Sequence, residues 1–499
     1  MNLIPQTPGT TPGYYCTWEA QNALFAKEKA MGTNPEKFAG PGGAQIARHN
    51  MNEEIIFGKN GMARQFEKIR RDLYFVLDDG WDVPYNVHPD TQRHAFGSLL
   101  LEEERFPSCI GTPEERLGKI NDKIKAMGWR GVGLWIASQA QGETDENRLG
   151  DADSRDYWAE RMAWCRYAGV DYWKVDWGVY ERCKAWRKML TELGRKEHPG
   201  LLIEHAACRG PINENNGRFA GWSPAQDEFL SIMDFSDIFR SYDVVLQFTT
   251  VSTLDRLAVL LSSPVSADAM GLVNCEDELY MGAALGCPVG IMRTALDEVI
   301  PRKLDEAIRA VMWQRLAPAY GVSEAQTYIS EELGCDTWFF TPGSTWCNPL
   351  IGHEIMQSAP LIVSRGMDLP RVDAAGDKAP YVVASRNPNG AVTVAALPRC
   401  FKDRKVTPLT KVGIDVHSTR VPIGILGEFD ELQLNFAQYA EGKRVYAQDL
   451  AGDVAHEITG QVKINGMELL IPGGLITSIG LEAATPSDTS SPGMVLVLA

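Results

Sequence analysis

The sequence lacks the features by which nucleic-acid-binding and membrane proteins are usually recognised. Its 499 residues contain no Lys/Arg-rich run, and a formal net charge of −16 would repel nucleic acid and anionic lipid. No apolar run is long enough to cross a bilayer, and the first residues, MNLIPQTPGTTPGYY, do not resemble a secretory leader. We therefore expect no nucleic-acid or membrane partner. As written, the sequence predicts a cytoplasmic protein, whereas a chain trimmed of its leader would be secreted or periplasmic.

Metal-binding and disulfide patterns are also missing. The ten cysteines are scattered without a CxxC pair, and no Cys/His cluster has the spacing of a zinc site. We expect buried free thiols in a reducing compartment and no cofactor or bound metal. The 499-residue length is sufficient for a catalytic barrel and an accessory domain. The sequence does not decide the oligomeric state, so a homo-oligomer stays open.

From about residue 13 to 295, short apolar runs alternate with helical segments, which is typical of a parallel α/β fold. Their number, eight, is that of a closed (β/α)8 TIM barrel. The predicted strands span residues 14–18, 73–79, 131–137, 170–176, 201–206, 238–243, 264–268 and 287–292. One predicted helix, from Thr112 to Gly128, has a capping threonine, a proline at its first position and a glycine at its end.

The pattern changes after residue 320. Two segments, YVVASRNPNGAVTVAAL and QVKINGMELLIPGG, carry Asn-Gly between alternating apolar residues, which predicts β-hairpins. We therefore predict a catalytic barrel over residues 1–320, with a long first βα loop over about 19–72, and an antiparallel β-sandwich over 321–499.

Carboxylates are concentrated at the C-terminal ends of the predicted barrel strands, where TIM-barrel enzymes build their active sites. One such acid is usually a helix cap, but a ring of them would repel itself unless a cation or a polyol bound there. The candidates are Asp78, Asp79, Asp176, Glu204, Asp243 and Asp268.

A metal site is one explanation for this ring, but few histidines accompany the acids, and Lys174 and Arg240 lie among them. A sugar explains the mixture better, because carboxylates accept hydrogen bonds from hydroxyls and Trp18, Trp81 and Trp177 offer apolar faces.

The stretch DYWKVDWGVY places Lys174 two residues before Asp176, so both side chains should point to one face of the strand. There the ammonium would help to keep Asp176 ionised as a nucleophile. The alternative is a plain ion pair that closes the top of the barrel.

These residues resemble the retaining α-galactosidases and α-N-acetylgalactosaminidases of glycoside hydrolase clan D, chiefly family 27 with features of family 36. The resemblance rests on YFVLDDGW, ERFPS, MGWRGVGLWIA, AGVDYWKVDWG, LIEHAACRG and SADAMGLVN, which occur in the family's order. It covers the whole barrel and, more loosely, the β-domain behind it.

The resemblance implies residue roles. Asp176 would be the nucleophile, and the substrate would be bound by Trp18, Asp78, Asp79, Lys174, Glu204, Arg240 and Asp268. Asp243 would be the acid/base, although it follows Arg240 by three residues where the family has four. Asp237 and Asp234 are the fallback candidates.

The implied activity is that of a retaining exo-glycosidase that removes terminal α-galactosyl-type residues by double displacement. α-N-Acetylgalactosaminidase and β-L-arabinopyranosidase activities, a carbohydrate-binding relative without turnover, and a magnesium-dependent lyase or isomerase stay open.

Overall fold

The computed structural model describes residues 1–31, 47–85, 87, 92–207, 226–241, 248–266, 268–295, 303–341 and 352–499. Its first half is a closed barrel in which strands β1 to β8 pair in sequence order and β1 pairs with β8. All of these pairs are parallel. The barrel strands are β1 (Gly13–Cys16), β2 (Leu73–Leu77), β3 (Gly131–Ile136), β4 (Tyr172–Val175), β5 (Leu202–His205), β6 (Ile238–Arg240), β7 (Leu272–Glu276) and β8 (Val289–Ile291). The predicted TIM barrel is confirmed.

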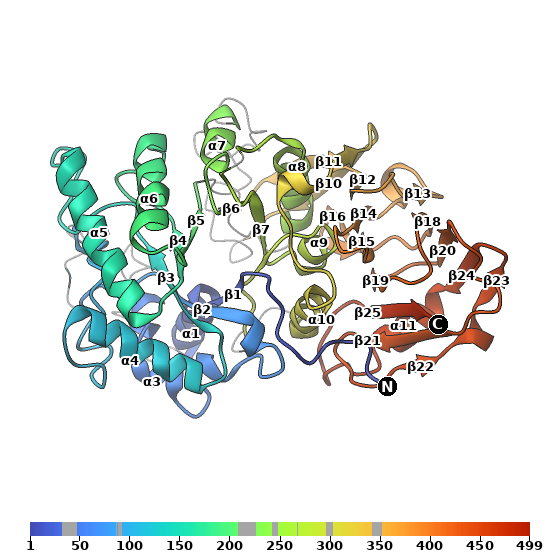
Figure 1. Ribbon diagram of the computed structural model, residues 1–499, viewed down its shortest axis with the longest axis horizontal. Helices are drawn as coiled ribbons and strands as arrows, with labels where there is room; N and C mark the ends of the chain where they lie inside the picture. The colour runs from blue at the N-terminus through green and yellow to red at the C-terminus, as the bar shows by residue number, and fades with distance from the viewer. Residues whose placement is uncertain are drawn as a thin grey trace.

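Helices surround the barrel and cover its outer surface (Figure 1). They are α1 (Trp18–Met31), α3 (Glu53–Phe57), α4 (Pro113–Ala126), α5 (Asp151–Ala168), α6 (Lys184–Glu197), α7 (Gln226–Met233), α8 (Thr249–Ser262), α9 (Leu279–Ala284) and α10 (Leu304–Gln314). The capping signals locate α4 well, since the Glu115 carboxylate accepts a 3.0 Å hydrogen bond from the backbone of Thr112, where the helix begins.

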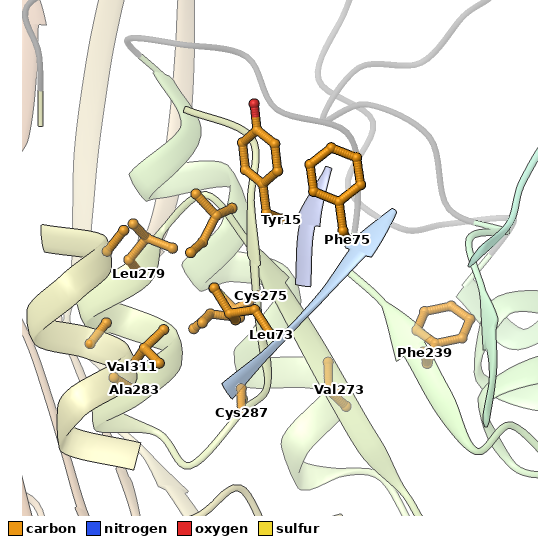
Figure 2. Close-up of a cluster of buried hydrophobic side chains, with 14 of the residues drawn as sticks. Tyr15, Leu73, Phe75, Phe239, Val273, Cys275, Leu279, Ala283, Cys287 and Val311 are labelled. Carbon is orange, nitrogen blue, oxygen red and sulfur yellow. The ribbon is translucent and has the colours of Figure 1, made fainter. Parts of the chain in front are cut away.

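The barrel strands are buried on both faces, as parallel strands covered by helices should be. Tyr15 of β1 and Phe75 of β2 lie side by side with ring centroids 5.5 Å apart, and both face the surrounding core (Figure 2). Leu279 and Ala283 of α9 and Val311 of α10 belong to the same core.

The inside of the barrel is tightly filled. A Cβ on Gly290 of β8 would lie 2.7 Å from the ring of Tyr14, so a glycine is needed there for the tyrosine to fit. Tyr14, Cys16, Tyr74, Trp135 and Tyr172 form part of this interior cluster.

Where the structure describes it, the second half contains β-strands, short 3-10 turns and one further α-helix, α11 (Gly473–Gly480). We call the sheet ordered β22-β21-β25-β19-β15-β14-β12-β9 the inner sheet and the sheet ordered β13-β18-β20-β24-β23 the outer sheet; β11-β10-β16-β17 form a third sheet. The strands are β9 (Thr327–Ile329), β10 (Leu333–Phe339), β11 (Glu354–Pro360), β12 (Ile362–Arg365), β13 (Arg371–Val372), β14 (Tyr381–Arg386), β15 (Val392–Leu397), β16 (Arg399–Lys402), β17 (Arg404–Val406), β18 (Lys411–Val416), β19 (Ile423–Leu426), β20 (Glu431–Phe436), β21 (Val445–Asp449), β22 (His456–Glu457), β23 (Lys463–Asn465), β24 (Glu468–Pro472) and β25 (Gly493–Leu498).

The inner and outer sheets pack face to face over one apolar core, so the predicted β-sandwich is confirmed. Both predicted hairpins are present, as β14–β15 and β23–β24. Most strand pairs of this half are antiparallel, as predicted, but β12–β14, β15–β19, β18–β20 and β10–β16 are parallel pairs. Each of these pairs is joined through an intervening connection rather than a tight turn, and tight turns are what the sequence pattern reveals.

The inner sheet also packs against the barrel helices, so barrel and sandwich share a continuous core. A buried ion pair between Arg309 of α10 and Asp449 of β21 crosses this contact, with a 2.9 Å N–O distance. Residues before β1 run along the sandwich, where the backbone N–H of Leu3 donates to Gln448 (Figure 1). Within the described residues, no helix combines the length and apolarity needed to cross a membrane.

Candidate active site

The C-terminal ends of the barrel strands bring charged side chains into contact. In the register of the barrel, Lys174 lies beside Glu204, and Arg240 lies beside Asn274. Asp78 and Asp79 follow β2 directly, and Asp176 follows β4. Glu276 is the last residue of β7. The strands therefore bring acidic and basic side chains together at one end of the barrel.

These side chains form an alternating series of ion pairs that we call the charge chain. Lys174 Nζ lies 3.1 Å from Asp78 Oδ2 and 3.2 Å from Glu276 Oε1. Arg240 then connects the other oxygen of Glu276, at 3.2 Å, to Asp176 Oδ1, also at 3.2 Å. Glu276 is therefore shared by two cations, and Asp78 and Asp176 occupy the two ends.

Asp176 is the most accessible member of the charge chain. Its side chain is 13% exposed, against 2% for Lys174 and Arg240 and 0% for Glu276. Its Oδ2 accepts a 3.0 Å hydrogen bond from the indole N–H of Trp135, and its backbone carbonyl accepts one from Arg187. The carboxylate is thus fixed by contacts from β3, β6 and α6, with one edge toward solvent.

An aromatic cluster adjoins Asp176. The rings of Phe96, Trp135 and Trp177 contact one another, with centroids 5.0 to 5.7 Å apart. Trp18, the first residue of α1, is half-buried and packs against the interior cluster that contains Phe96 and Trp135. These rings supply an apolar face next to a carboxylate, the combination that sugar binding uses.

The opposite end of the charge chain is tied into the first two strands. Asp78 accepts a hydrogen bond from the thiol of Cys16 at 2.9 Å, and its backbone N–H donates to Thr17. Asp79 is held by Arg48, whose Nε and Nη2 lie 2.5 and 2.7 Å from its two oxygens. Arg48 comes from the long connection between β1 and β2, so this connection helps to build the site.

Glu204 lies deeper in the barrel and is fully buried. Its carboxyl group accepts hydrogen bonds from the Tyr172 hydroxyl and from Asn274 Nδ2, both at 2.8 Å, and the Tyr14 hydroxyl lies 3.3 Å from its Oε1. The Tyr14 hydroxyl donates its proton to Glu276 at 2.8 Å and so connects the surroundings of Glu204 to the charge chain.

The two buried glutamates have opposite pKa shifts. Burial raises the pKa of Glu204 to about 7, although Arg240 and Lys174 act against it. Burial also opposes ionisation of Glu276, but Lys174 and Arg240 outweigh it and lower the pKa of that carboxyl. Lys174 shows the complementary effect, since Asp78 and Glu276 raise its pKa despite burial. Glu276 is therefore the ionised carboxylate that holds the two cations.

Several predicted contacts differ in the structure. Lys174 does not pair with Asp176; it pairs with Asp78 and Glu276, and Arg240 is the cation that contacts Asp176. The hydrogen bonds of Glu204 are made inside the barrel, away from any solvent-accessible surface. Both residues thus support the site from within. Trp81, considered as a sugar-facing ring, is fully buried and donates its indole N–H to the carbonyl of Trp135.

The seventh strand was predicted in the wrong place. The strand runs from Leu272 to Glu276, and Asp268 lies on an exposed turn that precedes it. The same turn contacts the opposite end of the barrel, since Ser266 donates to the carbonyl of Asp234 ahead of β6. Asp268 therefore does not join the charge chain, and Glu276 occupies the strand end that it was expected to hold.

The candidates for an acid/base residue are separated in the same way. Asp237 lies at the start of β6, bound to Arg195 and to the backbone of Ile203, and Asp234 precedes it. Both are at the barrel end remote from Asp176. Asp243 lies outside the described residues.

Glu276, Arg48 and Trp135 are the site residues that sequence reasoning missed. Glu276 ends an apolar run, LVNCE, that has the composition of a strand, so a better choice of the seventh strand would have found it. Arg48 and Trp135 carried no comparable signal, because their contacts depend on tertiary packing.

The described residues include no group of three or more His, Cys, Asp or Glu side chains that could hold a metal ion. His205, the histidine nearest the acids in sequence, has its ring nitrogens 3.2 Å from Arg187 and 2.7 Å from Thr191. Burial lowers its pKa well below the usual value, which keeps the ring neutral.

No known family profile and no curated protein matches the sequence. Among solved structures, a family 27 β-L-arabinopyranosidase from Geobacillus stearothermophilus aligns with a TM-score of 0.39 and 10% identity, over 98% of this chain and 97% of that one. α-Galactosidase I from Mortierella vinacea aligns with a TM-score of 0.38 and 11% identity, over 99% and 97%. A putative α-N-acetylgalactosaminidase from Bacillus halodurans aligns with a TM-score of 0.35 and 12% identity, over 73% and 96%. Scores and identities this low carry no conclusion about family or activity.

Proposed function

We propose that the protein is a retaining glycoside hydrolase that removes terminal α-galactosyl-type residues, with Asp176 as its nucleophile. The observation that carries the proposal is the position of Asp176. It lies at the C-terminal end of β4, is the most exposed member of an otherwise sealed charge chain, and adjoins the aromatic cluster. The sequence motifs that resemble clan D lead to the same residue.

The contacts of Asp176 suit a nucleophile. A guanidinium and an indole N–H bind its two oxygens and favour the carboxylate form, while side-chain packing fixes its direction. Glu276 holds Arg240 from the other side and so orients the guanidinium toward Asp176. Lys174, Glu204 and Glu276 are assigned to positioning, and Trp18, Asp78 and Asp79 to sugar contacts.

The proposed reaction is a double displacement. Asp176 attacks the anomeric carbon while the acid/base residue, which we assign to Asp243, protonates the leaving oxygen. Asp243 then deprotonates a water molecule, which hydrolyses the glycosyl-enzyme with net retention. The separation expected of the two carboxyl groups is about 5 Å.

The test is hydrolysis of p-nitrophenyl α-galactoside, β-L-arabinopyranoside and α-N-acetylgalactosaminide in the presence of EDTA. Turnover of one of them is expected, and the preferred substrate distinguishes the related specificities. Loss of turnover on chelation would contradict a metal-free reaction. Binding of the free sugars without hydrolysis would instead favour a carbohydrate-binding protein.

Asp176→Ala should abolish this turnover, and azide should restore cleavage with an inverted glycosyl azide as product. Asp171→Ala is the matched control, because Asp171 precedes the same strand at the other end of the barrel and pairs with His198. Full turnover in Asp176→Ala, or equal loss in both variants, would rule out Asp176 as the nucleophile.

A further inference from the structure

An open groove lies at one end of the β-sandwich, in a different part of the molecule from the charge chain. Its volume is about 850 Å³, within the range of roughly 300–1,000 Å³ that small-molecule sites occupy. We call it the sandwich groove. It is lined by the segment that enters β9 and by residues at the ends of β12, β14, β18 and β20.

The unexpected parallel pairs explain why the groove forms there. In the inner sheet β12 and β14 run parallel, and in the outer sheet β18 and β20 run parallel. Residues 366–368, 386–388, 415–417 and 435–437, which lie at the carboxyl ends of these strands, all line the groove. An antiparallel pair would bring only one carboxyl end to each such edge. The two parallel pairs bring four carboxyl ends to the same end of the sandwich, and the residues at these four strand ends form the walls of the groove.

Three lining side chains have unused hydrogen-bonding capacity. Asp368, Arg386 and His417 line the groove, and within the described part of the chain their side chains make no hydrogen bond or ion pair. They offer a carboxylate acceptor, a guanidinium donor and an imidazole that can do either. Beside them, Asn387 is buried and fixed by a 2.7 Å hydrogen bond to the carbonyl of Pro318.

The charges of the groove disfavour an anion. Glu324 and Asp368 outnumber Arg386 among the charged residues that line it, and the third lining acid, Asp415, is paired with Arg371. Partial desolvation and the neighbouring Arg386 lower the pKa of the exposed His417 imidazole below its usual value, which favours its neutral form. The groove therefore carries a negative balance, within a protein whose net charge is −16.

An exposed aromatic ring completes the lining. Tyr328 is 37% exposed and its hydroxyl donates to Gln326, which holds the ring at the groove wall. Hydroxyl groups of a sugar can pair with both acceptors and donors, and its C–H face can pack against a tyrosine. A neutral polyhydroxylated ligand matches this combination better than an anion or a purely apolar molecule does.

We propose that the sandwich groove is a binding site for a neutral oligosaccharide, separate from the barrel site. The proposal does not depend on the reaction assigned to Asp176. It predicts that a sugar chain binds on the sandwich whether or not the protein hydrolyses it.

Hydroxyl-radical footprinting read by mass spectrometry tests this proposal, because Tyr328 and His417 are exposed and oxidisable. The probes are raffinose, maltotriose and cellotriose, and sodium phosphate is the anionic comparison. With at least one oligosaccharide, oxidation of both residues should fall about threefold in a saturable way, since a sugar bound in the groove covers the two side chains that line it and shields them from solvent. The Asp176→Asn protein should show the same protection.

The double variant Asp368→Ala with Arg386→Ala should lose this protection. Asp430→Ala with Lys463→Ala is the charge-matched control, since both residues are exposed on the same sandwich and neither lines the groove. The control should retain protection. No protection by any oligosaccharide, equal protection in the groove variant, or stronger protection by phosphate would each overturn the proposal. Loss of protection in Asp176→Asn alone would assign the sugar to the barrel site.

Discussion

The barrel interior and the sandwich interior are both sealed from solvent, yet they are filled with different chemistry. The sandwich core consists of Val, Ile, Leu, Phe, Met and Ala side chains from the two sheets and α11. The barrel interior instead contains Lys174, Glu204, Arg240 and Glu276, each at most 2% exposed. Both regions are buried, but of the two cores, as far as the structure describes them, only that of the barrel includes ionisable groups; the Arg309–Asp449 pair lies between barrel and sandwich.

This difference separates stability from function. Buried apolar surface stabilises a fold directly, whereas buried ion pairs recover little more than their own desolvation cost. A barrel can be filled with branched apolar side chains, as the sandwich is. The charge chain is therefore better explained by its effect on Asp176 and Asp78, the two acids at its ends, than by stability.

The largest effect is expected from Glu276→Ala, which leaves Lys174 and Arg240 buried without their shared partner. The free energy of unfolding should fall by about 3–5 kcal/mol, measured by denaturant titration. Glu192→Ala, which removes an exposed pair with Lys188 at 3.8 Å, should change stability by less than about 0.5 kcal/mol. If Glu276→Ala cost as little stability as Glu192→Ala, Lys174 and Arg240 would not depend on Glu276 as a charged partner.

A purely apolar loss in the sandwich should be nearly as large but should leave the barrel site intact. Leu434→Ala removes a fully buried side chain of β20 and should cost about 2–5 kcal/mol of unfolding free energy. Turnover per folded molecule, measured at a temperature where the variant stays folded, should equal that of the wild type. A loss of turnover in proportion to stability would connect the two regions more tightly than their contacts indicate.

A smaller effect should appear in the pH dependence of stability. Because the folded-state pKa of Glu204 is raised to about 7, the folded protein holds a proton that the unfolded chain releases near pH 4.3. The proton held by Glu204 therefore makes the free energy of unfolding decrease as the pH rises from about 4.3 to about 7. Glu204→Gln removes it, so the variant should gain stability relative to the wild type between those pH values, as followed by denaturant titration. If the difference in unfolding free energy between the two proteins stayed constant over this pH range, the raised pKa of Glu204 would be contradicted.

The smallest effect is expected at the sandwich surface. Arg371 and Asp415 form a two-pronged pair at 2.8 and 3.0 Å, with both side chains more than half exposed. Solvent screens such pairs, so Arg371→Ala should cost only about 0.2–1 kcal/mol in thermal or chemical unfolding. A cost near that of Glu276→Ala would remove the contrast between buried and exposed charge.

The sequence revealed the features that depend on local patterns. The alternation of apolar runs and helices predicted the barrel, and DYWKVDWGVY placed Asp176 correctly at the end of β4. The position of β7 was wrong because PVSAD and LVNCE are both short apolar runs bounded by turn residues, and only packing into the barrel distinguishes them.

The ion-pair partners of the charged residues were harder to predict than their positions on the strands. Lys174 and Asp176 share one face of a strand, but side chains across the barrel are as close as those along a strand. Lys174 thus contacts Asp78 and Glu276, while Arg240 contacts Asp176. The parallel strand pairs of the sandwich were missed for a related reason, because long-range pairing leaves no turn signature in the sequence.

The segment before β1 has a consequence for dissecting the protein. The carbonyl of Met1 accepts a hydrogen bond from Ala455, and Asn2 and Leu3 bind the amide of Gln448, so these residues complete an edge of the sandwich (Figure 1). A fragment cut at residue 320 would therefore separate the sandwich from one of its own pieces, in addition to exposing the surface that packs on the barrel helices. Expression of residues 321–499 alone should yield an aggregation-prone product, and adding the segment 1–12 as a separate peptide should partly restore its solubility.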